Sequence, residues 1–266
     1  MSNLFELQRF ARLVSSHFRK NLKGYLISSL VLVGVTVILF LLVVSTRSET
    51  IDAGQQFLVY FLVIYGGLFI FSSTIFQSYQ RPKEDLFQLM LPASKTEKFL
   101  LAWLVSFPLY TICANALYFA VRYVVMHYYA MQGYEIADFF EYDRLFYQVD
   151  GISAFKALTL VYVFLHAFAF IGSLIFRKMA VLKIALTLLL AVFAYWAINS
   201  LLYRMIFDVD IQQAPLLPLM PLYLEDGTTT YRVAIANWPS WIFALALVVT
   251  GLLWVASYHK LREKEG

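Results

Sequence analysis

Six long apolar runs divide this chain, and each is long enough for a helix to cross a lipid bilayer. They cover residues 25–44, 57–76, 99–125, 157–176, 181–207 and 238–257. A helix of about 20 residues spans the hydrocarbon core of a bilayer, which is roughly 30 Å thick. The third and fifth runs are longer, and such helices tilt or project beyond the bilayer. The sequence therefore predicts an all-α integral membrane protein with six transmembrane helices.

Composition supports this prediction and excludes a soluble domain. Apolar residues make up 61% of the 266, charged residues make up 14%, and the mean hydropathy is +0.69. Soluble domains are only about half apolar. No repeat or long linker divides the chain, so residues 1–266 are expected to form a single transmembrane domain. No signal-peptide cleavage site is recognised before the first run, so that span is expected to stay in the protein.

The distribution of basic residues predicts how the helices are oriented. The chain ends and the segments 77–98 and 177–183 lie on one side of the six spans, and that side carries fifteen of the 21 Lys and Arg. The other side carries six of them and eleven of the 17 acidic residues. Because Lys and Arg are enriched on the cytoplasmic side of membranes, both termini are expected in the cytoplasm. This asymmetry explains the net charge of +4 without a nucleic-acid partner.

The residues before the first span have the pattern of an amphipathic helix. Apolar residues recur at helical spacing on one face, and they are Leu4, Leu7, Ala11, Val14, Phe18 and Leu22. Basic residues occupy the rest of the surface, and they are Arg9, Arg12, Arg19, Lys20 and Lys23. Residues 1–23 are therefore expected to lie on the anionic inner leaflet. A docking surface for a cytoplasmic partner is compatible with this interpretation.

A short cytoplasmic helix is expected between the second and third spans. Pro82 suits the first turn of a helix, Glu84 and Asp85 lie at the favourable end of its dipole, and Pro92 ends it. The helix is more apolar than a solvated connector requires, at Leu86, Phe87, Leu89 and Met90. These side chains indicate a surface that binds a partner.

A capping box predicts where the third transmembrane helix begins. Ser94 is followed three residues later by Glu97, so the serine can accept from the backbone of the first turn while the glutamate reaches back. The helix is therefore expected to start at Ser94, before the apolar run itself.

Two longer segments lie on the opposite side of the membrane. Residues 130–156 are rich in acidic and aromatic residues, and a short amphipathic helix at the interface is expected there. Within residues 208–238, Asp226 and Gly227 stand between strand-prone residues and predict a small β-hairpin.

No motif for catalysis is found in the sequence. The chain lacks a phosphate-binding loop, a metalloprotease helix and a nucleophile elbow. Its four histidines lack ligand spacing and Cys113 is the only cysteine, so neither a bound metal nor an intrachain disulfide is expected. His166 lies in mid-span and is interpreted as a hydrogen-bonding partner of a neighbouring helix, with a functional role as the alternative. No Asp or Glu lies inside the six runs, which disfavours a secondary carrier.

A few polar residues near or within the spans have structural interpretations. Arg122 and Arg204 lie near the outer ends of their spans and are expected to reach headgroups or to pair with outer acidic residues. Asn115 and Asn199 lie inside spans and are expected to hydrogen-bond to neighbouring helices.

The arrangement resembles the permease subunit of a type-2 ABC exporter, a bacterial six-span protein that works with a separate ATPase. The resemblance rests on the basic helix 4–23, the short helix 84–91 and the stretch Leu91-Pro-Ala-Ser-Lys-Thr-Glu97 before the third span. It implies that residues 84–91 form a coupling helix seated in the ATPase, oriented by Glu84 and Asp85. The anchors of that helix would be Leu86, Phe87, Leu89 and Met90. The basic residues of the N-terminal helix, Arg9, Arg12 and Arg19 among them, would contact lipid or the ATPase.

The resemblance also implies a homo- or heterodimer in the bacterial inner membrane. Substrate would cross where spans two and five meet, near Tyr65, Ser72, Tyr195 and Asn199. ATP and Mg would bind to the partner ATPase, so this chain is expected to be no enzyme and to hold no cofactor of its own. The sequence assigns no substrate. The main alternative is a non-transporting membrane scaffold or assembly factor that recruits a cytoplasmic partner through the same apolar residues.

Overall fold

The computed structural model describes residues 5–45, 50–76, 94–139, 148–149, 152–176, 178–207, 222–226, 229–233 and 238–264. Its helices are α1 (Leu7–Ser45), α2 (Ala53–Thr74), α4 (Lys95–Leu104), α5 (Tyr110–Met131), α6 (Ala154–Ile175), α7 (Ala180–Phe207) and α8 (Trp238–Lys264). A π-helical turn, η2 (Val105–Leu109), joins α4 to α5. In the described ranges six helical units are long and apolar enough to cross a membrane, with α4, η2 and α5 counted as one. The prediction of six membrane-spanning helices is confirmed.

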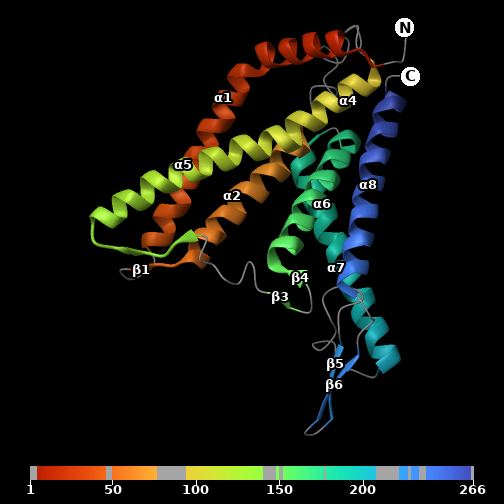
Figure 1. Cartoon of the computed structure of the whole chain (residues 1–266). Coiled ribbons are helices and arrows are strands. Elements are labelled where there is room, and N and C mark those ends of the chain that lie inside the picture. The colour runs from red at the N-terminus through yellow and green to blue at the C-terminus, as the bar shows by residue number, and fades with distance from the viewer. Residues whose placement is uncertain are drawn as a thin grey trace.

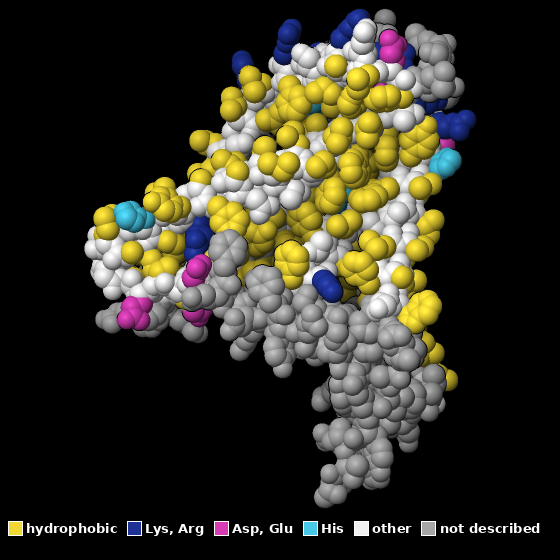
Figure 2. Space-filling view, viewed as in Figure 1, with side chains coloured by type: hydrophobic (Ala, Val, Ile, Leu, Met, Phe, Trp, Pro, Cys, Tyr) yellow, Lys and Arg dark blue, Asp and Glu magenta, His cyan; other side chains and the backbone are white. Residues whose placement is uncertain are grey.

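Both ends of the chain lie at the same end of the helical bundle, and the β5–β6 hairpin lies at the opposite end (Figure 1). Figure 2 shows hydrophobic side chains over the flank of the bundle, with Lys and Arg gathered mainly at the end that carries the termini. An apolar flank next to a basic end is what a protein that spans a lipid bilayer presents. The cytoplasmic location of the basic end remains a prediction.

Helix α1 continues the basic N-terminal segment into the first span without a break, and it bends on the way (Figure 1). The side chains of His17 and Tyr25, eight residues apart in α1, meet with Nε2 and Oη 2.5 Å apart. Between them, Asn21 Nδ2 donates to the carbonyl oxygen of His17 at 2.9 Å. A side chain that enters the backbone ladder in this way is a recognised cause of helix bending.

The π-helical turn η2 contains Pro108. Proline has no N–H to donate, and its ring collides with the carbonyl four residues earlier in an α-helix. A π-helical turn changes the hydrogen-bonding register locally, so the helix continues past Pro108 from α4 into α5.

Short β-ribbons connect some of the helices. Strand β1 (Thr50–Ile51) pairs in parallel with β2 (Glu135–Ile136), and β3 (Gln148–Val149) pairs antiparallel with β4 (Ile152–Ser153). Strands β5 (Leu222–Asp226) and β6 (Thr229–Val233) form an antiparallel pair in which Asp226 faces Thr229. The hairpin predicted around Asp226 is therefore confirmed.

Within residues 130–156, where a short amphipathic helix is expected, the structure describes residues 130–139, 148–149 and 152–156. Helix α5 ends after Met131, because Gly133 adopts a φ of +89° and the chain reverses there. Gly133 N donates to Ala130 O and Tyr134 N donates to Tyr129 O, at 3.1 and 3.2 Å. This pair of bonds is a Schellman motif, which stops a helix. Strands β2, β3 and β4 follow among the described residues, α6 begins at Ala154, and the interfacial helix stays a prediction.

The main core lies where α1, α2 and α5 meet. Phe40, Leu68 and Tyr118 are fully buried there, and the rings of Phe40 and Tyr118 lie 5.9 Å apart. A second cluster lies near the end with the termini, where Phe76 and Phe170 pack against Leu261 of α8. In contrast, α7 keeps most of its apolar side chains exposed, so it offers the bilayer or another chain a broad apolar face.

Candidate functional site

The first turn of α4 is the most densely hydrogen-bonded polar site among the described residues, and its local structure follows from two residues. Ser94 is the N-cap, and its hydroxyl accepts from Glu97 N at 3.3 Å. In return, Glu97 Oε2 accepts from Ser94 N at 2.9 Å. Both halves of the predicted capping box are present, and the start of the helix is confirmed.

The Glu97 carboxylate also binds the N-terminal helix, which the sequence did not reveal. Arg9 Nε donates to Oε2 at 2.8 Å and Arg9 Nη2 donates to Oε1 at 2.7 Å. Glu6 N donates to Oε1 at 2.9 Å. The carboxylate is fully buried, whereas the Arg9 side chain is 23% exposed. Two-pronged pairs of this kind fix orientation as well as position, so Glu97 ties the beginning of α1 to the beginning of α4.

Helix α8 reaches the same turn from the other side. Thr96 Oγ1 lies 3.3 Å from Tyr258 Oη, and Lys95 Nζ donates to the carbonyl oxygen of Arg262 at 3.3 Å. The ring of Phe99 meets the edge of Tyr258 at a centroid distance of 5.5 Å. We call the set formed by Glu6, Arg9, Ser94, Lys95, Thr96, Glu97, Tyr258 and Arg262 the α4 junction.

The α4 junction lies where the segment 77–93 rejoins the bundle. The residue before that segment, Phe76, is fully buried against Phe170 and Leu261. The residue after it is Ser94, the N-cap of α4. Both flanks of the segment are therefore anchored among α1, α4, α6 and α8. The predicted coupling residues lie outside the described residues, and they are Glu84, Asp85, Leu86, Phe87, Leu89 and Met90.

The other basic residues of the N-terminal helix differ from Arg9. Arg12, Arg19, Lys20 and Lys23 are exposed along α1, on the end of the bundle that is rich in basic residues. Their predicted contact with lipid or with a partner remains a prediction. In the sequence Arg9 and the other basic residues of this helix form one pattern. Only the tertiary structure shows that Arg9 binds Glu97 while the others are exposed.

The predicted substrate-path residues are not gathered at one place. Tyr65 lines a groove of about 850 Å³ between α2, α6 and α7, together with Phe61 and Trp196. The walls of this groove do not include Ser72, Tyr195 or Asn199. Ser72 and Asn199 are buried in the bundle instead, at 0% and 8% exposure. The structure thus shows a groove at the meeting of spans two and five that is apolar around Tyr65.

His166 is confirmed as a structural hydrogen-bonding residue. Its ring is fully buried, with Nε2 3.0 Å from Ser106 Oγ, and Trp254 Nε1 donates to its Nδ1 at 3.2 Å. Because an indole N–H only donates, Nδ1 is the acceptor and Nε2 carries the proton. His166 therefore joins α6 to η2 and to α8.

The polar groups at the opposite end of the bundle are also satisfied by protein partners. Arg122 Nε donates to Gln56 Oε1 at 2.7 Å, and its guanidinium lies 5.5 Å from the ring centroid of Phe139. Tyr118 Oη donates to the carbonyl oxygen of Gln56 at 2.8 Å. Deeper in the bundle, Asn115 accepts from Tyr60 Oη at 2.9 Å. The expectation that Asn115 bonds a neighbouring helix is confirmed, and the described partner of Arg122 is an amide rather than an acid.

Comparisons with protein-family models, with curated proteins and with solved structures each find no match to this chain.

Proposed function

We propose that this chain is the membrane-spanning permease subunit of an ATP-driven ABC exporter in the bacterial inner membrane. It works as a homo- or heterodimer with a separate cytoplasmic ATPase, which binds ATP and Mg and performs the hydrolysis. Both termini lie in the cytoplasm. Six apolar helices, a basic end that carries both termini and the resemblance of the segment 84–97 support this proposal.

The observation that carries the proposal is the anchoring of the segment 77–93 at both of its flanks. Phe76 is buried against α6 and α8, and Ser94 caps the helix whose Glu97 holds Arg9. A partner that binds residues 84–91 therefore acts on α1, α4, α6 and α8 together. This is the mechanical arrangement that a coupling helix needs, because closely packed elements transmit small displacements without absorbing them.

The mechanism follows from a shift in populations. ATP favours a closed pair of ATPases, and the coupling helices then favour the permease arrangement that fits this closed pair. In this mechanism the N-terminal end of α4 moves with the coupling helix, and the α4 junction holds α1 and α8 to that end. The continuous helix made of α4, η2 and α5 can bend at the π-helical turn around Pro108, since such turns often mark hinges.

Substrate would pass along the dimer interface, for which α7 and the groove beside Tyr65 provide the apolar surface. Of the predicted substrate-path residues, Tyr65 lies on this surface, whereas Ser72 and Asn199 are buried within the bundle. The chemistry of the groove favours an apolar or amphiphilic substrate over a highly charged one.

A second candidate is a non-transporting membrane scaffold or assembly factor. One observation favours it: His166 and Asn115, deep in the bundle, bond to protein groups of neighbouring helices. Polar side chains that are satisfied in this way serve helix association without offering a path.

Purification of the full chain from its membrane in mild detergent separates the two candidates. We expect a nucleotide-binding ATPase to co-purify, and we expect it to be lost when Leu86, Phe87 and Met90 become serine. The matched control changes two exposed apolar residues at the same end of the bundle, Met179→Ser and Leu182→Ser, and should keep the ATPase. If crosslinking captures no ATPase with the native chain, the permease proposal fails and the scaffold takes its place.

A further inference from the structure

A pocket of about 280 Å³ lies between α2, α5 and α6, in the part of the bundle away from the two termini. Helix α2 packs against both α5 and α6, and these two helices diverge toward that end (Figure 1). The volume is close to the lower limit of about 300–1,000 Å³ for small-molecule sites. Because Tyr60, Tyr65 and Tyr162 line its walls, we call it the tyrosine pocket.

The tyrosine pocket has an open mouth and a buried floor. Phe155 and Thr159, which line it near the start of α6, are exposed. Ile64, Tyr65 and Tyr162, which line it further in, are buried. A small molecule can therefore enter beside α6 and reach the interior between the helices.

Aromatic rings form most of the walls. Seven of the twelve lining residues are Phe or Tyr. The rings of Phe57 and Tyr60 are stacked with centroids 6.1 Å apart, and the ring of Tyr65 meets that of Tyr162 edge-on at 5.0 Å. Aromatic rings attract a further flat ring in the same offset or edge-on arrangements. The walls therefore favour a flat ligand.

The lining of the tyrosine pocket also excludes a charged ligand. None of its lining residues is acidic or basic. The guanidinium of Arg122 lies on the ring of Phe139, a lining residue, but it bonds to Gln56 and does not line the pocket itself. A buried charge without a counter-charge is costly. The ligand that fits is therefore uncharged.

Two of the three tyrosines have already used their hydroxyl hydrogens. Tyr60 Oη donates to Asn115 Oδ1 at 2.9 Å. Tyr162 Oη lies 2.8 Å from Thr111 Oγ1, which itself donates to the carbonyl oxygen of Phe107 at 2.6 Å. The hydrogen between Tyr162 and Thr111 therefore comes from Tyr162. Neither tyrosine has a hydrogen left for a ligand.

Tyr65 differs, because the described part of the chain offers its hydroxyl no hydrogen-bond partner. The residue is only 8% exposed, yet its hydroxyl oxygen is not sealed from a water-sized molecule. Tyr65 interacts electrostatically with Tyr60 and Tyr162, which line the tyrosine pocket but not the wider groove against α7. Its unused O–H therefore faces the tyrosine pocket.

Asn115 supplies a second unused hydrogen. Its amide nitrogen donates to the carbonyl oxygen of Thr111 at 2.7 Å, which occupies one of its two N–H groups. Within the described residues the other N–H has no acceptor. With Tyr65, the tyrosine pocket thus presents two donors, and a ligand that satisfies both must carry two acceptors. Carbonyl oxygens on a flat uncharged ring meet this requirement.

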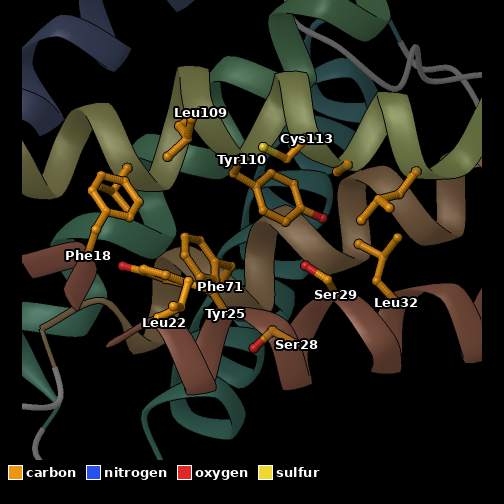
Figure 3. A pocket seen from close by; sticks show the side chains of 13 residues that line it. Phe18, Leu22, Tyr25, Ser28, Ser29, Leu32, Phe71, Leu109, Tyr110 and Cys113 are labelled. Carbon is orange, nitrogen blue, oxygen red and sulfur yellow. The ribbon is translucent and has the colours of Figure 1, made fainter. Parts of the chain in front are cut away.

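The groove in Figure 3, between α1, α2 and α5, lacks this feature although tyrosines line it too. Figure 3 shows Tyr25 and Tyr110 beside Phe71. Tyr25 Oη meets His17 Nε2 at 2.5 Å, and Tyr110 Oη lies 3.4 Å from the carbonyl oxygen of Ile64, to which it donates. That groove has tyrosine rings without an unused tyrosine hydroxyl, so it provides a control for the tyrosine pocket.

We propose that the tyrosine pocket binds the ring of a membrane-soluble quinone. The ring lies against the aromatic walls, one carbonyl oxygen accepts from Tyr65 Oη, and the other accepts from the amide of Asn115. The molecule enters at the exposed mouth beside Phe155 and Thr159. Binding needs neither an ATPase nor transport, so this site stands or falls independently of the exporter proposal.

Calorimetric titration of the full chain in mild detergent with duroquinone tests the site. The fully methylated ring of this quinone leaves no position at which the thiol of Cys113 would readily add. We expect one saturable site per chain. Durene has the same methylated ring without the carbonyl oxygens, and its affinity, corrected for partition into empty micelles, should be lower on the order of tenfold. The reason is that each neutral hydrogen bond contributes about a factor of five.

Removal of one hydroxyl tests the role of Tyr65. Tyr65→Phe keeps the ring and should lower the affinity for duroquinone about fivefold, while the affinity for durene should stay the same. The matched control Tyr25→Phe removes a hydroxyl from the groove in Figure 3, and it should leave both affinities unchanged.

Blocking the mouth tests the location of the site. Thr159→Trp places a large ring at the entrance and should abolish binding of duroquinone. Thr187→Trp on α7 is the matched control and should preserve it. Both threonines are exposed, and their hydroxyls donate to carbonyl oxygens one turn earlier, at 2.9 Å for Thr159 and 2.7 Å for Thr187.

Four results would each overturn the proposal. The first is the absence of saturable binding of duroquinone to the native chain. The second is equal corrected affinity for duroquinone and durene, which would show that no hydrogen bond is formed. The third is an equal effect of Tyr65→Phe and Tyr25→Phe on the affinity for duroquinone. The fourth is unchanged binding in Thr159→Trp.

Discussion

Replacing Glu97 with glutamine tests the α4 junction at its most buried charge. Glutamine also completes a capping box at this position, so the start of α4 should be preserved. Glutamine keeps only one acceptor oxygen. If that oxygen retains the bonds from Ser94 N and Arg9 Nε, the new amide nitrogen faces Glu6 N and Arg9 Nη2 and cannot accept their bonds of 2.9 and 2.7 Å. A hydrogen bond to a charged group contributes about 1.5–3 kcal/mol, and the charged Arg9 loses its carboxylate partner, so we expect a loss of about 2–3 kcal/mol in the free energy of unfolding.

Glu263 provides the matched control for this experiment. It pairs with Lys260 at 2.7 Å, but their side chains are 66% and 47% exposed. Exposed pairs contribute about 0–1 kcal/mol, so Glu263→Gln should change the free energy of unfolding by less than half as much. Both variants lose the same charge by the same chemical change, and they differ only in burial and geometry.

The assay is reversible unfolding of the purified chain in mixed micelles of increasing dodecyl sulfate content, followed by tryptophan fluorescence. A double-mutant cycle with Arg9→Gln assigns the effect to the pair, because partners in one network show coupling energies of about 0.5–3 kcal/mol. The reasoning is refuted if Glu97→Gln is no more harmful than Glu263→Gln, or if the effects of Arg9→Gln and Glu97→Gln simply add.

Two further substitutions check the packing of the helices by the same assay. A Cβ at Gly172 would lie 2.6 Å from Ile184 Cγ1, so Gly172→Ala should destabilise the contact of α6 with α7 by about 1–3 kcal/mol; Gly66→Ala, where a Cβ meets nothing within 4 Å, should be nearly neutral. A Gly172→Ala variant as stable as Gly66→Ala would contradict this close approach. Tyr118→Phe removes the donor to a buried backbone carbonyl and should cost about 1 kcal/mol, whereas Tyr123→Phe, 71% exposed, should cost almost nothing. Equal stability of the two phenylalanine variants would show that the buried bond contributes nothing.

Features that depend on local sequence could be predicted well. The six spans follow from the length of apolar runs, and the N-cap of α4 follows from Ser94 and Glu97, which lie three residues apart. The β5–β6 hairpin follows from the turn at Asp226. In each case residues close in the sequence determine the backbone conformation. The N-cap and the turn do so through local hydrogen bonds, and the spans do so because a backbone inside the bilayer must satisfy its own hydrogen bonds.

The interfacial helix expected within residues 130–156 stays a prediction, because residues 140–147 lie outside the described residues. The acidic and aromatic pattern of residues 130–156 resembles an amphipathic helix. Gly133 stops α5 before this pattern, so any helix in the segment is separate from α5. A glycine at this position was visible in the sequence, and its role as a helix stop could have been inferred from it.

Pairings between distant residues required the tertiary structure. The sequence presents Arg9 as one of several basic residues on a surface helix, yet it is bound to Glu97, 88 residues away. His166 lies between Ser106 and Trp254 for the same reason, because helices separated in the chain pack side by side. The sequence by itself determined that this chain has six helices able to span a membrane and that α4 begins at Ser94. Which polar side chains meet was decided by the tertiary structure, since a buried charge or ring nitrogen takes its partner from whichever helix lies next to it.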